Sequence, residues 1–273
     1  FRRVLFRSWQ AIVVTASQIL FGLISPTAES LAVGQLLGLA VAIVVSNRLI
    51  PLRLTGTPSR VEILGQVIVF WKRHRKMPFF ALPADFINIV SGQIPLLFIS
   101  SRFGTDAGGV YALAMRIIGG PISLLGSAVL DVFKRRAATA FRENGHCRVE
   151  YRQAFQLLGV AGLGLAVAIW FAAEWFFIFA FGEPWREAGT VALWLAPMFA
   201  LRFVASPLSY IFYIVGAQRT DLLWQCALLC MTLITMIWST DFQGSVVTYS
   251  AGYSGLYIVY LLMSAYYSRG ARV

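Results

Sequence analysis

The sequence predicts an all-α, polytopic membrane protein, and three observations support this prediction. Long, mostly apolar stretches recur along the chain, and about 20 such residues in a helix cross a hydrocarbon core of roughly 30 Å. The mean hydropathy is +0.72, and only 13% of the residues are charged. The basic residues between the apolar stretches also alternate from loop to loop. Together these features exclude an ordinary soluble domain.

Eight transmembrane helices are predicted in all. In chain order they cover 9–25, 29–46, 80–101, 108–131, 155–180, 188–214, 220–239 and 244–267. The polar stretch 47–79 separates the first two spans from the other six. Within the second group we expect short turns on the outer side and one long inner loop at 132–154.

The basic residues predict the orientation of these helices. Counted outside the spans and the first eight residues, sixteen Lys and Arg lie in alternate loops and the C-terminal tail, whereas the loops between them hold only Arg102 and Arg186. The sixteen are Arg48, Arg53, Arg60, Lys72, Arg73, Arg75, Lys76, Lys134, Arg135, Arg136, Arg142, Arg148, Arg152, Arg219, Arg269 and Arg272. Cytoplasmic loops are enriched in Lys and Arg, so these loops and the C-terminus are predicted to be cytoplasmic.

The net charge of +11 has a different meaning here than in a soluble protein. Because the charge gathers in predicted cytoplasmic loops, it fixes topology and meets anionic lipid headgroups, and we expect no nucleic-acid partner. The three cysteines predict no disulfide framework. Cys226 and Cys230 lie four apart on one helix face, which favours packing over a metal pair. We expect no cofactor and no metal.

The first eight residues, FRRVLFRS, match the translation of a common sequencing-library adapter. We therefore interpret 1–8 as an adapter-derived scar and the chain as the C-terminal part of a longer protein. The remaining chain divides into 9–46, the last two helices of an N-terminal lobe, the cytoplasmic linker 47–79, and a six-helix C-terminal lobe at 80–273. Apolar residues at helical spacing in 61–76, followed by a basic cluster, predict an amphipathic helix in the membrane interface. A solvated loop with an apolar patch is the alternative.

Three segments carry a family likeness. They are KMPFFALPADFINIVSGQIPLLFIS at 76–100, YALAMRIIGGPISLLGSAVLDVF at 111–133, and FGEPWREAG at 181–189 followed by LWLAPMFALRFVASPLSYIF at 193–212. In order and spacing the chain resembles, over about 10–265, bacterial polysaccharide biosynthesis proteins. These are O-antigen-type, lipid-linked oligosaccharide flippases of the multidrug/oligosaccharidyl-lipid/polysaccharide exporter superfamily. The resemblance implies two six-helix lobes around a central cavity, with this chain corresponding to helices five to twelve and the first four absent.

The same resemblance implies a function. Such a transporter flips undecaprenyl-diphosphate-linked oligosaccharide across the bacterial inner membrane for export of O-antigen, capsule or exopolysaccharide, O-antigen being the polysaccharide of lipopolysaccharide. The implied partners are this lipid-linked substrate, bilayer lipids, a coupling ion (H⁺ or Na⁺) and other polysaccharide-assembly proteins.

Other function classes would call for different residues. A multidrug exporter of the same superfamily would favour an acidic cavity, and a non-functional fragment is a further alternative. A membrane glycosyltransferase or acyltransferase would need an Asp-x-Asp or a catalytic His with a nearby acid. His74 and His146 lie in predicted loops with no acid in catalytic register, so we expect no enzyme and no catalytic residues.

Ionisable residues within the spans are the candidate functional residues. A charge at the bilayer centre costs roughly 2.5–3.5 kcal/mol on insertion scales, so each calls for a partner, a cavity or a function. Arg116 and Arg202 are predicted to bind the substrate pyrophosphate, because the planar guanidinium fork suits phosphate. Asp85 is the candidate for ion coupling, while Glu174 falls at the outer interface. An alternative is an Asp85–Arg202 ion pair at matching depth that holds the helices together.

Small and polar residues accompany these charges on the same helix faces, as expected of faces that turn toward protein or water rather than lipid. The predicted polar lining of the cavity consists of Asn88, Gln93, Ser123, Ser127 and Ser206.

Overall fold

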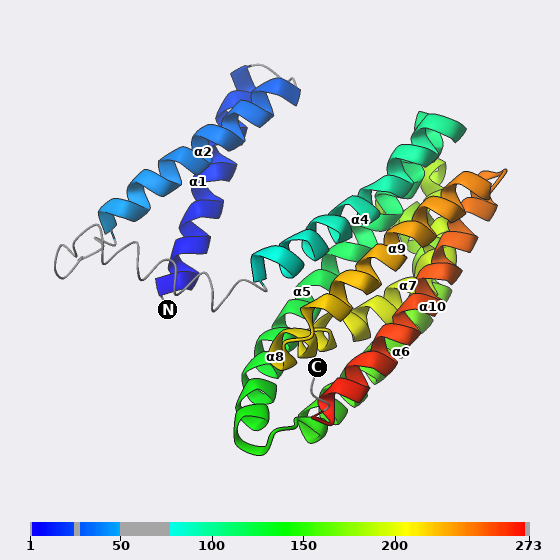
Figure 1. Ribbon diagram of the computed structural model, residues 1–273. Helices are drawn as coiled ribbons and strands as arrows, with labels where there is room; N and C mark the ends of the chain where they lie inside the picture. The colour runs from blue at the N-terminus through cyan, green and yellow to red at the C-terminus, as the bar shows by residue number, and fades with distance from the viewer. Residues whose placement is uncertain (1, 25–27, 50–76, 271–273) are drawn as a thin grey trace. The chain divides into compact units, whose positions relative to one another are not determined.

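The computed structural model describes residues 2–24, 28–49 and 77–270, which belong to two compact units, 1–69 and 70–273. In the first unit α1 (Arg2–Ile24) and α2 (Ala28–Leu49) pack against each other (Figure 1). Gly38 permits their close approach, because a Cβ there would lie 2.7 Å from the Cα of Val14. Of the linker predicted at 47–79, residues 50–76 lie outside the described residues, and with them the interfacial helix predicted for 61–76.

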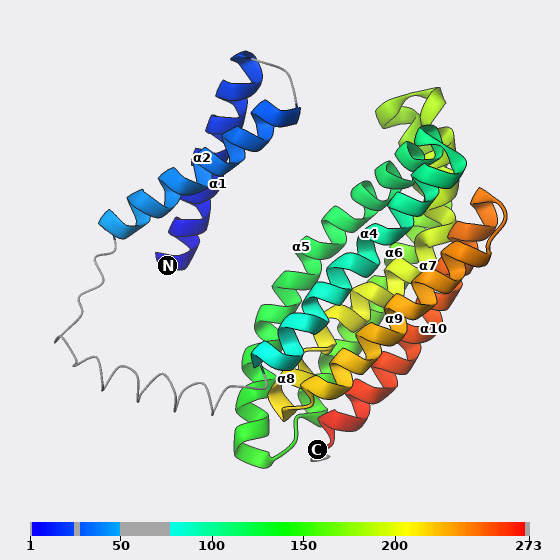
Figure 2. The same ribbon diagram turned by 45° about the horizontal axis from the view of Figure 1, so that its top comes forward.

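The second unit is a bundle of long helices (Figures 1 and 2). Its elements are η1 (Met77–Ala81), α4 (Leu82–Phe103), α5 (Thr105–Asn144), α6 (Arg148–Phe181), η2 (Glu183–Trp185), α7 (Arg186–Leu208), α8 (Ile211–Val215), α9 (Gln218–Trp238) and α10 (Phe242–Ser268). No strand occurs in the described residues. Six helical segments here are long and apolar enough to cross a membrane. The prediction of an all-α polytopic bundle is confirmed.

The span predicted at 188–214 is a broken helix. α7 ends at Leu208, directly after Pro207, and the short helix α8 follows from Ile211. Proline lacks an N–H donor and its ring crowds the preceding turn, which is why helices break or bend at such positions.

The prediction of a long inner loop at 132–154 is wrong. α5 continues to Asn144 and α6 begins at Arg148, which leaves three residues between them. The basic segment after Phe133 also has an apolar helix face, because Phe133, Ala137 and Ala140 are buried at helical spacing. Lys and Arg are themselves good helix formers. The helix ends only at Gly145, whose left-handed backbone (φ 72°) caps it.

The core of the second unit surrounds α7. In the apolar part of the span that contains α7, 61% of the residues are buried, against 17% in the spans of α5 and α6. Helices α5, α6 and α10 pack around α7. Large apolar side chains such as Phe171 (81% exposed) and Trp238 (82% exposed) point outward from the bundle. This arrangement suits a bundle whose outer surface meets lipid.

Both ends of the bundle are fastened by polar contacts. At one end the guanidinium of Arg102 donates to the carbonyls of Met236 and Ile237 at 3.2 and 3.1 Å. A basic side chain at the C-terminus of α9 in this way satisfies carbonyls that have no partner within the helix. At the other end the N–H of Cys147 donates to the carbonyl of Ser268 at 3.0 Å. The α5–α6 turn is therefore held on the end of α10.

Candidate functional site

A hollow of about 620 Å³ lies among α4, α5 and α7. Its lining includes seven of the eight side chains selected from the sequence, which come from three separate helices. The seven are Asn88, Gln93, Arg116, Ser123, Ser127, Arg202 and Ser206. The structure therefore brings the predicted polar faces of three helices together around one space. Asp85 does not line the hollow.

Arg116 is exposed to the hollow and makes no hydrogen bond or ion pair with another described residue. The hydroxyls of Ser123 and Ser127 donate to carbonyls of their own helix, both at 2.8 Å, so their protons are already engaged. Gly120 leaves open space beside Arg116, since a Cβ there would have nothing within 4 Å. The cationic group of Arg116 is therefore free to meet a ligand.

Arg202 is partly buried and lies beside aromatic hydroxyls rather than a carboxylate. Its electrostatic neighbours are Tyr257, Tyr253, Tyr249 and Tyr111. Within the part of the chain that the structure describes, the ion pair that forms joins Arg186 to Glu183 at 2.7 Å. The alternative Asp85–Arg202 ion pair is not formed, because matching depth does not place two helix faces opposite each other.

The polar groups of the hollow lie at two main levels. Counted from the end of the bundle at which α4 passes into α5, Gln93 and Arg116 lie about ten residues deep and Asn88 and Arg202 about five residues deeper. Five residues of helix rise about 8 Å. All four side chains line the one hollow, so donors to an anion are available at two depths.

Asp85 lies one turn beyond Asn88, near the start of α4, and its side chain is exposed. Its charged or polar neighbours are Tyr213 and Asp221. It therefore belongs to the α8–α9 side of the bundle and not to the cationic hollow.

Asp221 is a candidate that sequence reasoning missed. It is 3% exposed, and its carboxylate accepts hydrogen bonds from the hydroxyl of Tyr260, from that of Tyr213 at 3.5 Å, and from Gln225. The Tyr260 ring stacks on Trp224 with ring centroids 4.0 Å apart. Asp221 is the second residue of the span predicted at 220–239 and is not among the candidates selected from the sequence. The available signal was the i, i+4 spacing of Asp221 and Gln225, which places both on one helix face.

Glu174 is partly buried between α6 and α7, where its carboxylate accepts a hydrogen bond from the Thr190 hydroxyl at 3.1 Å. Gly189 allows the two helices to touch there, because a Cβ at this position would lie 2.6 Å from the Cα of Glu174. The contact joins two helices and lies outside the hollow.

The charge of the hollow determines what it can bind. Its described lining carries two arginines and no Asp or Glu, so an anion is favoured. In the described ranges no three His, Cys, Asp or Glu residues gather as metal ligands.

Fold and site define a multi-pass membrane protein with a cationic hollow inside its helical bundle. The chain belongs to the polysaccharide biosynthesis protein family, whose model matches residues 2–190. It is 24% identical over 184 residues to the teichuronic acid biosynthesis protein TuaB of Bacillus subtilis (strain 168), a match that covers 67% of this chain and 38% of that relative. No solved structure matches the chain significantly. The chain thus spans well under half the length of that relative, and its family agrees with the resemblance seen in the sequence.

Proposed function

We propose that this protein flips an undecaprenyl-diphosphate-linked oligosaccharide from the inner to the outer leaflet of the bacterial inner membrane. The observation that carries the proposal is the hollow, in which Arg116 and Arg202 face one space and no carboxylate stands among the described lining residues. A guanidinium fork binds phosphate oxygens with two parallel hydrogen bonds. The pyrophosphate would occupy the hollow while the polyprenyl chain stays in the lipid. That TuaB is a teichuronic acid biosynthesis protein agrees with a polysaccharide substrate.

The charge of the hollow also argues against a multidrug exporter. A cationic drug would favour an acidic site, and the two arginines of the described lining repel it. The amides and hydroxyls of Asn88, Gln93 and Ser206 suit a polar sugar headgroup instead.

Ion coupling belongs to the same proposal, and its site is the group of carboxylates on α4 and α9. Asp85 was the candidate from the sequence, and Asp221 is its buried neighbour. A carboxylate surrounded by tyrosine hydroxyls can take up or release a proton at the cost of rearranging those hydrogen bonds. If Asp85 is the coupling group, Asp85→Asn should remove the dependence of transport on a H⁺ or Na⁺ gradient. Unchanged gradient dependence in Asp85→Asn would transfer the role to Asp221, which Asp221→Asn tests in turn.

The orientation proposed for this transporter follows from the basic loops, with the α5–α6 turn and the C-terminus in the cytoplasm. A cysteine placed at Asp106 should react with a membrane-impermeant maleimide added to intact cells, and one placed at Arg142 should not. The reverse pattern would invert the topology.

Binding of the carrier lipid tests the transport proposal directly. The purified chain in detergent should retain undecaprenyl diphosphate more strongly than undecaprenyl monophosphate and much more strongly than the uncharged polyprenol. Arg116→Ala should remove this order, whereas Arg142→Ala, an exposed arginine outside the hollow, should preserve it. Equal retention of all three lipids by the unmodified chain would refute the proposal.

A further inference from the structure

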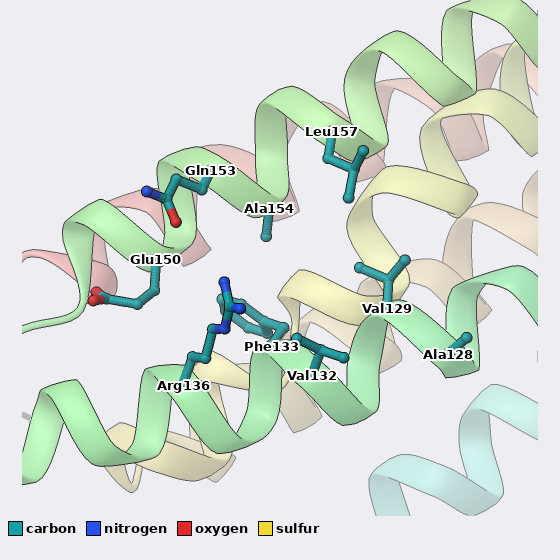
Figure 3. A pocket seen from close by; sticks show the side chains of 9 residues that line it. All are labelled: Ala128, Val129, Val132, Phe133, Arg136, Glu150, Gln153, Ala154 and Leu157. Atoms are coloured by element: carbon teal, nitrogen blue, oxygen red, sulfur yellow. The ribbon is translucent and has the colours of Figure 1, made fainter.

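A second hollowed region lies between α5 and α6, close to the turn that joins them. Here a groove of about 320 Å³ is walled by apolar side chains, among them Val129, Val132 and Leu157, with Phe133 as its buried floor. Figure 3 shows the guanidinium of Arg136 reaching into the gap between the two helices. The groove is thus apolar along its length and cationic at one end.

The cationic end continues into a polar hollow of about 470 Å³. The two spaces share Arg136, Glu150 and Gln153. The charged residues of the polar hollow are two arginines and two glutamates, with Glu143 and Arg135 completing the set. Its described lining is therefore neutral overall and carries both signs of charge.

These groups follow a fixed order along the helices. From the apolar walls near Val129 the order runs to Arg136 on α5, and then to Glu150 and Glu143 near the two helix ends at the turn. In Figure 3 the Glu150 carboxylate points away from Arg136, toward the start of α6. No ion pair joins Arg136 to another described residue. The cationic and anionic ends of the site are therefore both free for a ligand.

The size of the groove decides which kind of ligand fits. Ala128 and Arg136 are eight residues apart, which makes the groove about 12 Å long, and its volume then gives a mean cross-section of about 27 Å². A partner helix would insert only single side chains into such a groove, whereas a hydrocarbon chain can follow its whole length. A volume near ten water-sized groups admits the upper part of one hydrocarbon chain.

We propose that this groove binds a phospholipid of the phosphatidylethanolamine class. The upper part of an acyl chain lies against Val132 and Leu157, the phosphate accepts hydrogen bonds from Arg136, and the primary ammonium donates to Glu150 and Glu143. The order chain, phosphate, amine matches the order of the side chains. An anionic glycerol headgroup brings hydroxyls but no cation to the two glutamates, and a choline headgroup has no N–H to donate.

Native mass spectrometry of the delipidated chain tests the proposal, with phosphatidylethanolamine, phosphatidylcholine and phosphatidylglycerol of identical acyl chains. Phosphatidylethanolamine should be retained about tenfold more strongly than phosphatidylcholine, the effect expected of hydrogen bonds to charged groups. Arg136→Ala should weaken all three lipids. The double variant Glu143→Gln with Glu150→Gln should remove the preference for the ethanolamine headgroup and leave phosphatidylcholine binding unchanged.

Two further variants separate binding from folding. Leu157→Trp should fill the groove and weaken every lipid, and Leu157 is 62% exposed, so its replacement leaves the core intact. Arg152→Ala, an exposed arginine on α6 that lines neither space, should have no effect. Stronger retention of phosphatidylglycerol than of phosphatidylethanolamine, or displacement of phosphatidylethanolamine by stoichiometric undecaprenyl diphosphate, would overturn the proposal.

Discussion

The hollow among α4, α5 and α7 and the surroundings of Asp221 handle charge inside a membrane bundle in opposite ways. In the hollow, Arg116 is exposed, has no partner among the described residues and sits beside small side chains. At the other site Asp221 is 3% exposed and holds hydrogen bonds from Tyr260 and Tyr213. The first charge is left open to the hollow, and the second is satisfied by the protein itself.

The difference shows which charges are available for a ligand. A buried ion must have its hydrogen bonds fulfilled within the fold, since an unpaired one would cost several kcal/mol. A charge that faces a hollow can keep water until a ligand replaces it. Substrate binding is therefore expected of the arginines, while Asp221 is expected to affect stability as well as any coupling role.

The largest effect is expected at Arg116. Arg116→Ala should reduce transport at least about a hundredfold while leaving protein abundance near normal, because it removes a phosphate contact and no structural one. Arg116→Lys should restore activity only in part, since a lysine supplies the charge without the planar fork. The measurement is rescue of polysaccharide export in a strain that lacks the gene, with immunoblots for abundance. A loss of abundance equal to the loss of transport would show that Arg116 is structural.

The next effect is expected at Asp221. Asp221→Ala leaves the hydroxyls of Tyr260 and Tyr213 without their acceptor, and each buried unsatisfied group costs about 1–3 kcal/mol. The melting temperature of the purified protein should fall clearly, and Asp221→Asn, which keeps an acceptor oxygen, should lower it less. Asp85→Ala is the matched control, because that side chain is exposed and should change little. An unchanged melting temperature in Asp221→Ala would show that the hydrogen bonds of Asp221 do not stabilise the fold, and the contrast with the open charge of Arg116 would be lost.

The sequence was sufficient for the fold class and for the polar faces of the hollow. Apolar length and helical spacing are local properties, so the six spans after residue 77 and the faces of Arg116 and Arg202 could be predicted. Which faces meet across helices depends on rotation about each axis, and this is why the Asp85–Arg202 pair could not be judged from depth. Asp221 was missed because its partner Tyr260 is 39 residues away.

A smaller effect is expected for the pair that the structure does not form. Asp85→Ala and Arg202→Ala should act independently, so their effects on unfolding free energy should add within about 0.5 kcal/mol. The electrostatic neighbours of Arg202 are tyrosines, and Asp85 lies nearer Asp221. A double-mutant cycle by chemical denaturation in detergent gives the coupling energy. A coupling energy well above 1 kcal/mol would show that the two residues are in contact, and it would weaken the case for a free cationic hollow.

The smallest effect concerns Cys147, an ionisable group that is buried without a charged hydrogen-bond partner. Burial raises the pKa of the Cys147 thiol from 9.0 to about 12, and the nearby Glu150 carboxylate acts in the same direction. Because the pKa is raised, the thiol stays neutral below about pH 12, and its thiolate fraction at pH 8 is about a thousandfold lower than that of a free cysteine.

Maleimide at pH 8 should therefore leave Cys147 unmodified in the folded protein and label it after denaturation in SDS, with mass spectrometry of the peptides as the readout. Cys147→Ala should change neither transport nor lipid retention. Rapid labelling of the native thiol would show that the α5–α6 turn opens from the end of α10, and that burial there does not keep an ionisable group neutral.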